Sequence, residues 1–165
     1  EYRMEDADTV VIALGSVLGT IKDTVDELRG KGHRIGVLGI TCFRPWPTAA
    51  IRQALARAKR VVVVEKAFGV GLGGIVSANV RTSYAGALDD VYTVIAGLGG
   101  RPITRDSLTR VFLQCEEGNL ASLTFLDLNQ AAVDRALARE REHRRTGPIA
   151  EALLRDVGLV TAQLR

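Results

Sequence analysis

The chain has 165 residues, a formal net charge of +3, and a composition of 47% hydrophobic, 25% charged and 5% aromatic residues. This composition is typical of a globular protein with a sizeable core, and the mild charge excess with few aromatic side chains argues against a nucleic-acid partner. No apolar run is long enough to cross a bilayer and no signal peptide is visible, so we expect a cytoplasmic protein without a membrane partner.

Four apolar segments are predicted to be strands. The strongest signal is the run of four valines at 61–64, which has no polar face and is too short for a buried helix. Because β-branched residues pack well on a pleated surface, this run should be a central strand of a parallel sheet, covered on both sides. The other predicted strands are 9–14, 34–43 and 91–96.

A turn and a helix follow each of these strands. The helices are predicted at 20–29, 49–58, 75–84 and about 106–117. Thr48 is placed to cap the second of them. The fourfold alternation of strand and helix predicts an α/β fold with a doubly wound, mostly parallel sheet.

The last part of the chain differs in composition. Residues 118–122 form a predicted hinge, followed by a long charged helix at 124–145 and a last helix at 149–164. We therefore expect an α/β domain at 1–117 and a helical C-terminal arm at 118–165. The narrow apolar stripe of the arm suits packing on another chain and packing on its own domain equally well. Because the chain begins without an initiator methionine, we expect a processed or truncated product.

Few residues in the chain suggest catalysis or the binding of a metal or cofactor. Its two cysteines, Cys42 and Cys115, are far apart and form no C-x-x-C pair, so we expect two free thiols in a reducing compartment. Its two histidines, His33 and His143, have no metal-ligand spacing. Because no nucleophile–base set or carboxylate pair emerges, we predict no catalytic, cofactor-binding or metal-binding residue.

A glycine pattern between the third strand and its helix invites a nucleotide interpretation. Gly69, Gly71 and Gly74 match G-x-G-x-x-G, the dinucleotide fingerprint. However, the fingerprint normally follows the first strand, Glu65 would lie near the pyrophosphate, and the acidic pair at 89–90 precedes a strand instead of following one. We therefore favour glycines that serve turning and close helix packing over NAD binding.

The loop after the first strand, residues 15–20, resembles half of a phosphate-binding loop. It lacks the Lys-Ser or Lys-Thr pair, which argues against hydrolysis of a nucleoside triphosphate, although a helix N-terminus can attract an anion. Ser16 also lacks the Gly-x-Ser-x-Gly context and the histidine partner of a hydrolase nucleophile.

Loops at the C-terminal ends of the strands should meet on one rim, where open α/β sheets place ligands or interfaces. Arg44 and Glu65 follow successive strands, and the alternatives are a subunit-contact or ligand-facing edge and a salt bridge that braces two loops. We favour bracing or an interface over catalysis. The rim candidates are Ser16, Arg44, Pro45, Trp46, Glu65, Gly69, Gly71, Gly73, Gly74, Gly99, Gly100 and Arg101.

Six segments in this order carry a family resemblance: 2–7, 13–16, 43–47, 64–66, 69–74 and 96–101. Together they resemble the pyruvate:ferredoxin oxidoreductase family, specifically the C-terminal domain of its α subunit, called domain II in single-chain members. That domain is similar to the C-terminal domain of transketolase, which implies a transketolase C-terminal-like fold. The resemblance covers about residues 1–117, and Trp46 stands where the family usually has Phe.

The resemblance implies an enzyme that oxidatively decarboxylates a 2-oxoacid, with pyruvate favoured, using thiamine diphosphate and iron–sulfur clusters. It implies that other domains or subunits hold both cofactors, that the β subunit and further subunits are partners, that ferredoxin or flavodoxin accepts the electrons, and that coenzyme A is a substrate. This domain would contribute subunit contacts and be inactive alone. The alternative is a free-standing nucleotide- or anion-binding module that uses residues 15–20 or 69–74.

Overall fold

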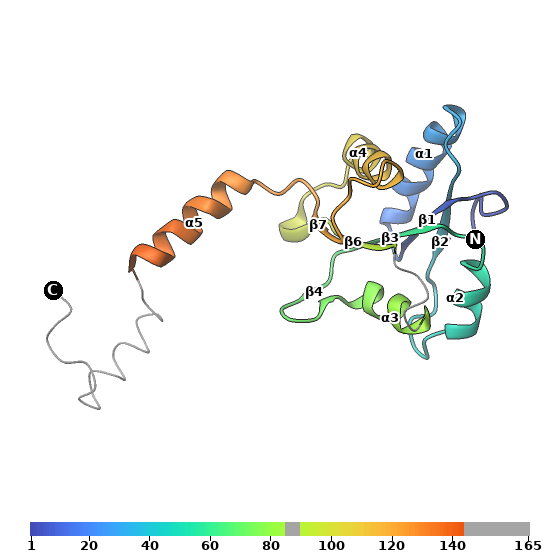
Figure 1. The fold of residues 1–165 in the computed structure, drawn as a ribbon, viewed down its shortest axis with the longest axis horizontal. Coiled ribbons are helices and arrows are strands. Elements are labelled where there is room, and N and C mark those ends of the chain that lie inside the picture. The colour runs from blue at the N-terminus through green and yellow to red at the C-terminus, as the bar shows by residue number, and fades with distance from the viewer. Residues whose placement is uncertain (85–89, 144–165) are drawn as a thin grey trace, which may run out of the picture. The chain divides into compact units, whose positions relative to one another are not determined.

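The computed structural model describes residues 1–84 and 90–143, and the chain divides into two compact units, Glu1–Asp127 and Leu128–Arg165. The first unit contains a five-stranded sheet in which every pair of neighbouring strands is parallel (Figure 1). In the order in which they lie in the sheet, the strands are β2 (Ile35–Gly39), β1 (Thr9–Ala13), β3 (Arg60–Glu65), β6 (Val91–Ile95) and β7 (Leu123–Phe125).

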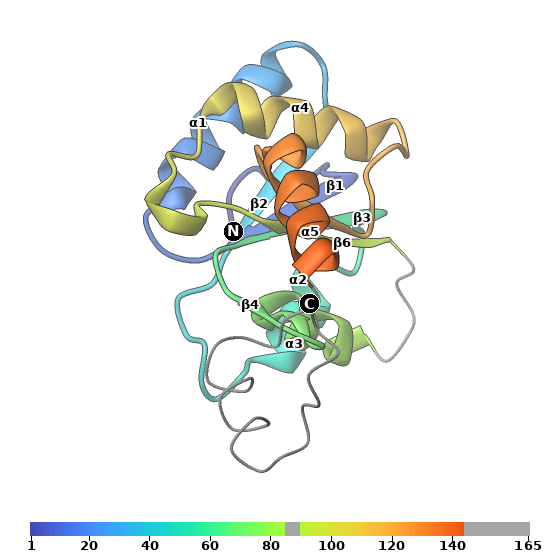
Figure 2. The same ribbon diagram turned by 90° about the vertical axis from the view of Figure 1, so that its left-hand side faces the viewer.

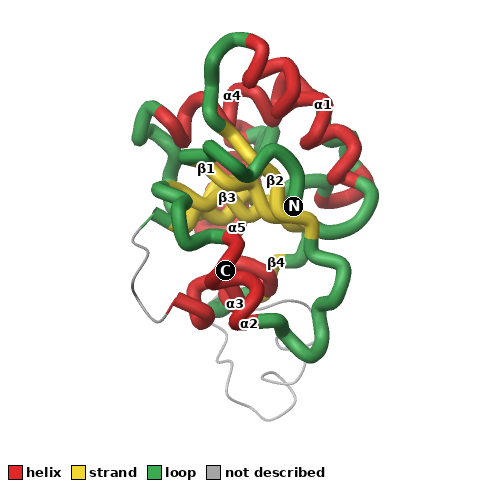
Figure 3. Tube along the Cα trace, turned by 90° about the vertical axis from the view of Figure 1, so that its right-hand side faces the viewer, coloured by secondary structure: helices red, strands yellow, loops and turns green. Residues whose placement is uncertain are grey.

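Helices cover both faces of this sheet. Figures 1 and 2 show α1 (Val17–Gly30) and α4 (Arg105–Glu116) on one face, and α2 (Thr48–Ala54) and α3 (Ile75–Tyr84) on the other. The tube in Figure 3 shows the strands as a layer between these two helical layers. The doubly wound α/β prediction is therefore confirmed, since helices cover both faces of a parallel sheet.

The valine run explains why the sheet needs both layers. Val62 and Val64 belong to the core cluster shared with α1 and α4, whereas Val61 and Val63 belong to the cluster shared with α2 and α3. All four side chains are almost fully buried. A strand that is apolar on both faces is stable only when both faces are covered, as the sequence pattern predicted.

The order of the strands creates a crevice. The chain passes from β1 outward to β2, then returns past β1 to β3 and continues to β6 and β7. The connections that leave β1 and β3 therefore diverge, and open α/β sheets have a crevice at such a switch point, outside the C-terminal ends of the strands.

A small hairpin follows β3 and was not predicted as one. Its strands are β4 (Phe68–Gly69) and β5 (Gly73–Gly74), which pair antiparallel around the three-residue turn 70–72. Gly71 and Gly73 have φ of +82° and +79°, a conformation that glycine adopts without steric cost. After β6, a short 3₁₀ turn (Leu98–Gly100) leads toward α4.

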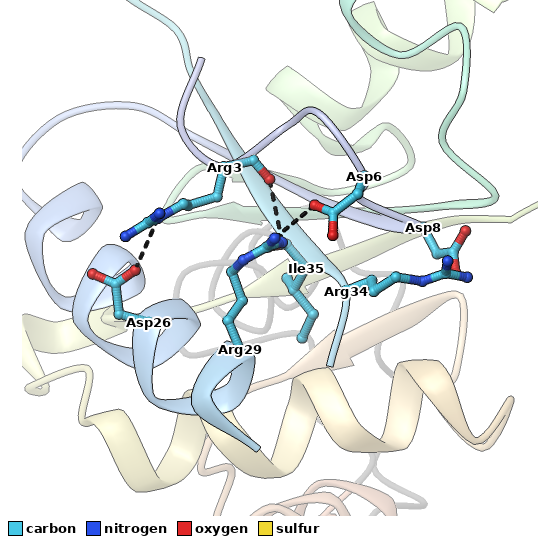
Figure 4. A network of polar contacts seen from close by, with 7 residues as sticks. All are labelled: Arg3, Asp6, Asp8, Asp26, Arg29, Arg34 and Ile35. Atoms are coloured by element: carbon cyan, nitrogen blue, oxygen red, sulfur yellow. Dashed lines mark hydrogen bonds and ion pairs between the residues drawn. The ribbon is translucent and has the colours of Figure 1, made fainter. Parts of the chain in front are cut away.

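The N-terminal segment protects the edge strand β2. Tyr2 forms an antiparallel bridge with Val37, with both N···O distances 2.8 Å, which satisfies backbone groups that an edge strand would otherwise expose. Arg29 of α1 holds this segment in place: it donates to the Asp6 carboxylate at 2.6 Å and to the Arg3 carbonyl at 3.4 Å (Figure 4).

Two predicted helix starts have different outcomes. Thr104 caps α4, because its hydroxyl accepts a hydrogen bond from the Ser107 amide at 3.2 Å. The predicted cap at Thr48 is wrong: Thr48 is already inside α2, Pro47 is at the cap position, and no side-chain cap bond forms there.

The segment after α4 differs most from the prediction. Residues 124 and 125, expected at the start of a long helix, belong to β7 and pair with β6, and the first compact unit ends at Asp127. The helix begins only at α5 (Gln130–His143), where the Asn129 side chain accepts from the Ala132 amide at 3.0 Å. The helix predicted at 149–164 lies outside the described residues. Among the described helices, none has the length and apolar character to cross a membrane.

Candidate functional site

A groove of about 610 Å³ lies at the C-terminal edge of the sheet, at the switch point. Its walls come from the loops after β1, β3 and β6 and from the first turns of α1 and α3. Four predicted rim residues line it: Ser16, Glu65, Gly100 and Arg101. The topology therefore brings together residues that are far apart in the sequence, because parallel strands end at one edge.

Glu65 is the buried charged residue of this groove, with only 7% of its surface exposed. Its carboxylate accepts two backbone hydrogen bonds from the first turn of α3, from Val76 at 2.8 Å and from Ser77 at 2.9 Å. These amides have no partner within the helix, and the positive end of the helix dipole favours a negative charge there. Glu65 therefore acts as an anchor for α3, and both of its carboxylate oxygens are engaged by backbone amides.

The contact between Glu65 and α3 also bears on whether the glycines at 69–74 could bind a dinucleotide. A pyrophosphate on that fingerprint would need the amides at the start of α3, which the Glu65 carboxylate occupies. Gly74 has no side chain because a methyl group there would overlap that carboxylate and lie 2.5 Å from the Ser77 hydroxyl. The glycines serve the hairpin turn and a close approach to Glu65, which is the interpretation that the sequence favoured over NAD binding.

The loop with Arg44, Pro45 and Trp46 is not part of the groove. Arg44 stacks on the Phe43 ring at 4.0 Å and donates to the Phe43 carbonyl at 2.8 Å. Trp46 donates from its indole to the Ser83 hydroxyl at 2.7 Å and packs against the core beneath α2 and α3. Since Glu65 is bonded to α3, the structure does not show the salt bridge between Arg44 and Glu65 that the sequence left open.

Arg101 forms part of the groove wall and fixes the end of the sheet. Its guanidinium donates to the carbonyl of Asp127 at 2.6 Å. The Asp127 carboxylate in turn accepts from Arg110 at 2.8 Å and from the Ser107 hydroxyl at 2.6 Å. Sequence reasoning missed Asp127, because it lay inside a helix that was predicted to begin at 124.

The remaining rim glycines do not line the groove. Gly69, Gly71 and Gly73 lie in the hairpin, and Gly99 lies in the 3₁₀ turn beside Gly100. Lys66 and Thr20 also line the groove, and neither was among the rim candidates, although the segments 64–66 and 15–20 contain them. Lys66 directly follows the valine strand and its glutamate, so its place at a strand end was the signal that could have identified it.

The chain's own cysteines do not fit the iron–sulfur clusters that the resemblance implies. An iron–sulfur cluster is usually held by four cysteine thiolates, whereas the full sequence has two cysteines. Cys42 is exposed and Cys115 is buried, and burial raises the pKa of the Cys115 thiol to about 12. Within residues 1–84 and 90–143, no group of three or more His, Cys, Asp or Glu side chains could hold a metal ion.

Sequence comparison identifies the family. The family model described as "Pyruvate:ferredoxin oxidoreductase core domain II" matches residues 7–108, which span β1 to the first turns of α4 and include the groove. The chain belongs to this family. The resemblance stated from the motifs is therefore confirmed.

Several relatives of this core domain II chain are curated subunits of oxidoreductases. It is 36% identical over 132 residues to pyruvate synthase subunit PorA of Methanothermobacter thermautotrophicus, covering 79% of this chain and 33% of the relative. It is 38% identical over 121 residues to PorA of Thermotoga maritima, covering 72% of this chain and 31% of the relative. The α subunit of NADH-dependent phenylglyoxylate dehydrogenase of Aromatoleum evansii is 34% identical over 119 residues, covering 70% of this chain and 28% of the relative. The chain thus spans about a third of the length of these relatives.

Two solved structures share the fold of core domain II. One is a 2-oxoglutarate:ferredoxin oxidoreductase from Magnetococcus marinus, with a TM-score of 0.50 and 20% identity over 67% of this chain and 18% of that chain. The other is a split gene transketolase, with a TM-score of 0.52 and 13% identity over 72% of this chain and 40% of that chain. At these identities the likeness concerns the fold alone, and it confirms the predicted transketolase C-terminal-like architecture.

Proposed function

We propose that this chain is the domain-II part of the α subunit of a cytoplasmic, thiamine-diphosphate-dependent 2-oxoacid:ferredoxin oxidoreductase that acts on pyruvate. The observation that carries the proposal is the family match over residues 7–108, together with relatives named as pyruvate synthase subunits. The complete enzyme would decarboxylate pyruvate oxidatively, form acetyl-coenzyme A and pass electrons through iron–sulfur clusters to ferredoxin or flavodoxin.

Within that enzyme, this domain would make contacts and leave catalysis and cofactor binding to other domains or subunits, including the β subunit. The state of Glu65 supports this role, because the buried carboxylate at the groove is committed to the amides of α3. The cysteine count and the positions of the two thiols also support cluster ligands outside this chain.

The choice of 2-oxoacid would also be made elsewhere in the enzyme. The same domain is 34% identical to that of a relative named for phenylglyoxylate and 38% identical to that of a relative named for pyruvate. Because the similarity barely changes between two different substrates, this domain has no evident role in reading the substrate side chain.

Anaerobic co-purification of the complete α subunit tests the proposal. The tagged subunit would be produced with its native partners, and the eluate assayed for reduction of a viologen dye that depends on both pyruvate and coenzyme A. The proposal expects a partner that carries thiamine diphosphate and iron–sulfur clusters, together with this activity. A lone subunit without partners or activity would overturn it, and ranking other 2-oxoacids in the same assay tests the preference for pyruvate.

Anion binding at residues 15–20 is the second candidate. It is favoured by one observation: Lys66 and Arg101 line the groove beside the N-terminus of α1. Anion or nucleotide binding at residues 69–74 is disfavoured, because the Glu65 carboxylate already accepts hydrogen bonds from the first amides of α3. Binding to the native state raises the melting temperature, so a thermal scan with inorganic phosphate and with mononucleotides tests it, and an unchanged melting temperature speaks against it.

A further inference from the structure

The hairpin formed by β4 and β5 presents apolar side chains to solvent. Val70 in its turn is 96% exposed, Leu72 is 64% exposed, and Phe68 at its base is 40% exposed. Exposed apolar surface continues along the same edge at Leu14 and Leu98, with 43% and 44% exposure. Several exposed apolar side chains at one edge of a domain favour an interaction site there.

The fold of the hairpin does not require apolar side chains at these exposed positions. The positive φ angles that the turn needs are supplied by Gly71 and Gly73. Hairpin turns otherwise favour Asn, Asp and Ser, which hydrogen-bond locally and suit solvent. Valine at the most exposed position of the turn therefore contributes nothing that the fold requires, and its presence points to a surface that covers it.

The hairpin is also held rigidly at its base. On one side, Gly74 lies against the Glu65 carboxylate, which is itself bonded to α3. On the other side, the Phe68 ring packs edge-to-face on Phe125 of β7, with centroids 5.1 Å apart. A projection that is ordered before binding loses little conformational entropy when a partner covers it, which favours affinity.

We propose that the turn 70–72 is a knob that inserts into an apolar pocket on a different subunit of the oxidoreductase, with a carboxylate at the rim of that pocket facing Lys66. This inference rests on the proposed function and specifies the contact that the domain makes. The relatives are named as subunits of oxidoreductases, so each of them has a different chain as its neighbour.

Charge supports the chemistry of this partner. Lys66 is exposed at the start of the hairpin, and residues 66–75 contain no acidic side chain, so this element carries a positive charge next to its apolar tip. A pocket that is apolar in its centre and acidic at its rim complements both features. Apolar anchors in the centre of an interface carry most of its binding energy, whereas charges at the rim mainly affect association rate and salt dependence.

The test uses the complete α subunit produced with its native partner subunits. Val70→Asp and Leu72→Asp place a charge at the tip, and Leu128→Asp is the matched control, because Leu128 is also an exposed leucine, at 47%, outside the hairpin. We expect each hairpin variant to weaken binding of the partner subunit by about tenfold or more, as for a central apolar anchor. The control should bind as the wild type does. Lys66→Glu should weaken binding less, and its effect should shrink as salt is added.

The melting temperature of the α subunit purified alone separates docking from folding, because exposed tip residues should leave it unchanged. A hairpin variant that binds the partner as tightly as wild type overturns the inference. So does a variant that lowers the melting temperature of the lone subunit, or one that only abolishes self-association of α subunits. If the wild-type subunit is active with pyruvate and coenzyme A, these outcomes overturn only the docking inference, and the proposed function stands. If the wild-type subunit has neither partners nor activity, the docking inference and the proposed function both fail.

Discussion

Glu65 at the end of β3 accepts a hydrogen bond from the backbone amide of Ser77 at 2.9 Å, inside the first turn of α3. The valine strand, the hairpin and α3 meet at this buried contact. One carboxylate thereby satisfies amides that the helix leaves unpaired and determines where the hairpin emerges from the domain. The contact explains why an acid follows the valine strand directly, where a phosphate-binding protein would have glycine.

Replacing Glu65 with glutamine tests the capping role. The amide side chain keeps one acceptor oxygen but loses the charge and turns an NH₂ group toward a backbone N–H. We expect Glu65→Gln to lower the free energy of unfolding by about 2 kcal/mol, the range for a buried hydrogen bond to a charged group. Urea denaturation at pH 7 measures the change, with Glu5→Gln as a control because Glu5 is exposed. Equal stability of the two variants would contradict the role.

Gly74 and Gly19 should respond in opposite directions to alanine. A methyl group at Gly74 meets the carboxylate of Glu65 and the hydroxyl of Ser77, so Gly74→Ala should destabilise the fold by about 1–3 kcal/mol through overpacking. Gly19 lies in α1 with nothing within 4 Å of the added group, so Gly19→Ala should stabilise it by about 0.5 kcal/mol. Thermal or urea unfolding measures both, and a neutral Gly74→Ala would show that the space beside Glu65 is larger than described.

The N-terminal segment should make stability sensitive to acid. The pKa of Asp6 is held below its usual value by the hydrogen bond from Arg29, and the pKa of Asp8 is lowered by hydrogen bonds from Lys59 and Arg34. Because both pKa values are lower in the folded state, the unfolded chain binds protons more readily as the pH falls. Their contribution is complete above the unfolded value near pH 4 and is lost as the pH falls through the folded pKa values.

Asp6→Asn measures this contribution. We expect the variant to be slightly less stable than the wild type at pH 7. The two stability curves should begin to converge below about pH 4 and meet once the pH has fallen below the lowered folded pKa of Asp6, where the folded wild type is also protonated. Urea denaturation between pH 7 and pH 3 provides the curves. A stability difference that is the same at every pH would mean that the effect of the substitution is independent of the charge on Asp6.

The two thiols should differ in reactivity. Cys115 is buried, and burial raises the pKa of its thiol to about 12, so almost no thiolate is present at pH 8. Cys42 is exposed. A coloured disulfide reagent at pH 8 should therefore label one thiol per native chain and two in denaturant, and Cys42→Ser should remove the fast reaction. Rapid labelling of both thiols in the native protein would show that the core around Cys115 opens.

The sequence was informative wherever the signal was local and strong. The valine run at 61–64 predicted a strand buried on both faces, and the alternation with amphipathic helices predicted a doubly wound sheet. Both are observed because burying apolar groups of fixed periodicity leaves few arrangements of strands and helices. The ordered motifs from 2–7 to 96–101 also sufficed to identify the family.

The sequence was least informative where a residue depends on a distant partner. Residues 123–125 are too few to signal a strand, and they become β7 only because the exposed edge of β6 supplies the backbone hydrogen bonds. The same limit applies to the hairpin, whose glycines predict a turn but do not show which side chains the turn leaves in solvent.

By itself, the sequence determined the α/β class, most of the elements, the family and the absence of cluster-forming cysteines, since these follow from residue type and spacing. Only the tertiary structure decided that Glu65 bonds to α3 and not to Arg44, that Arg44 and Trp46 lie away from the groove, and that Val70 is left uncovered. The physical reason is that the hydrogen bonds and the burial of a side chain depend on groups that the fold brings together from distant parts of the sequence. Spacing along the chain does not specify which of several nearby partners a side chain will contact.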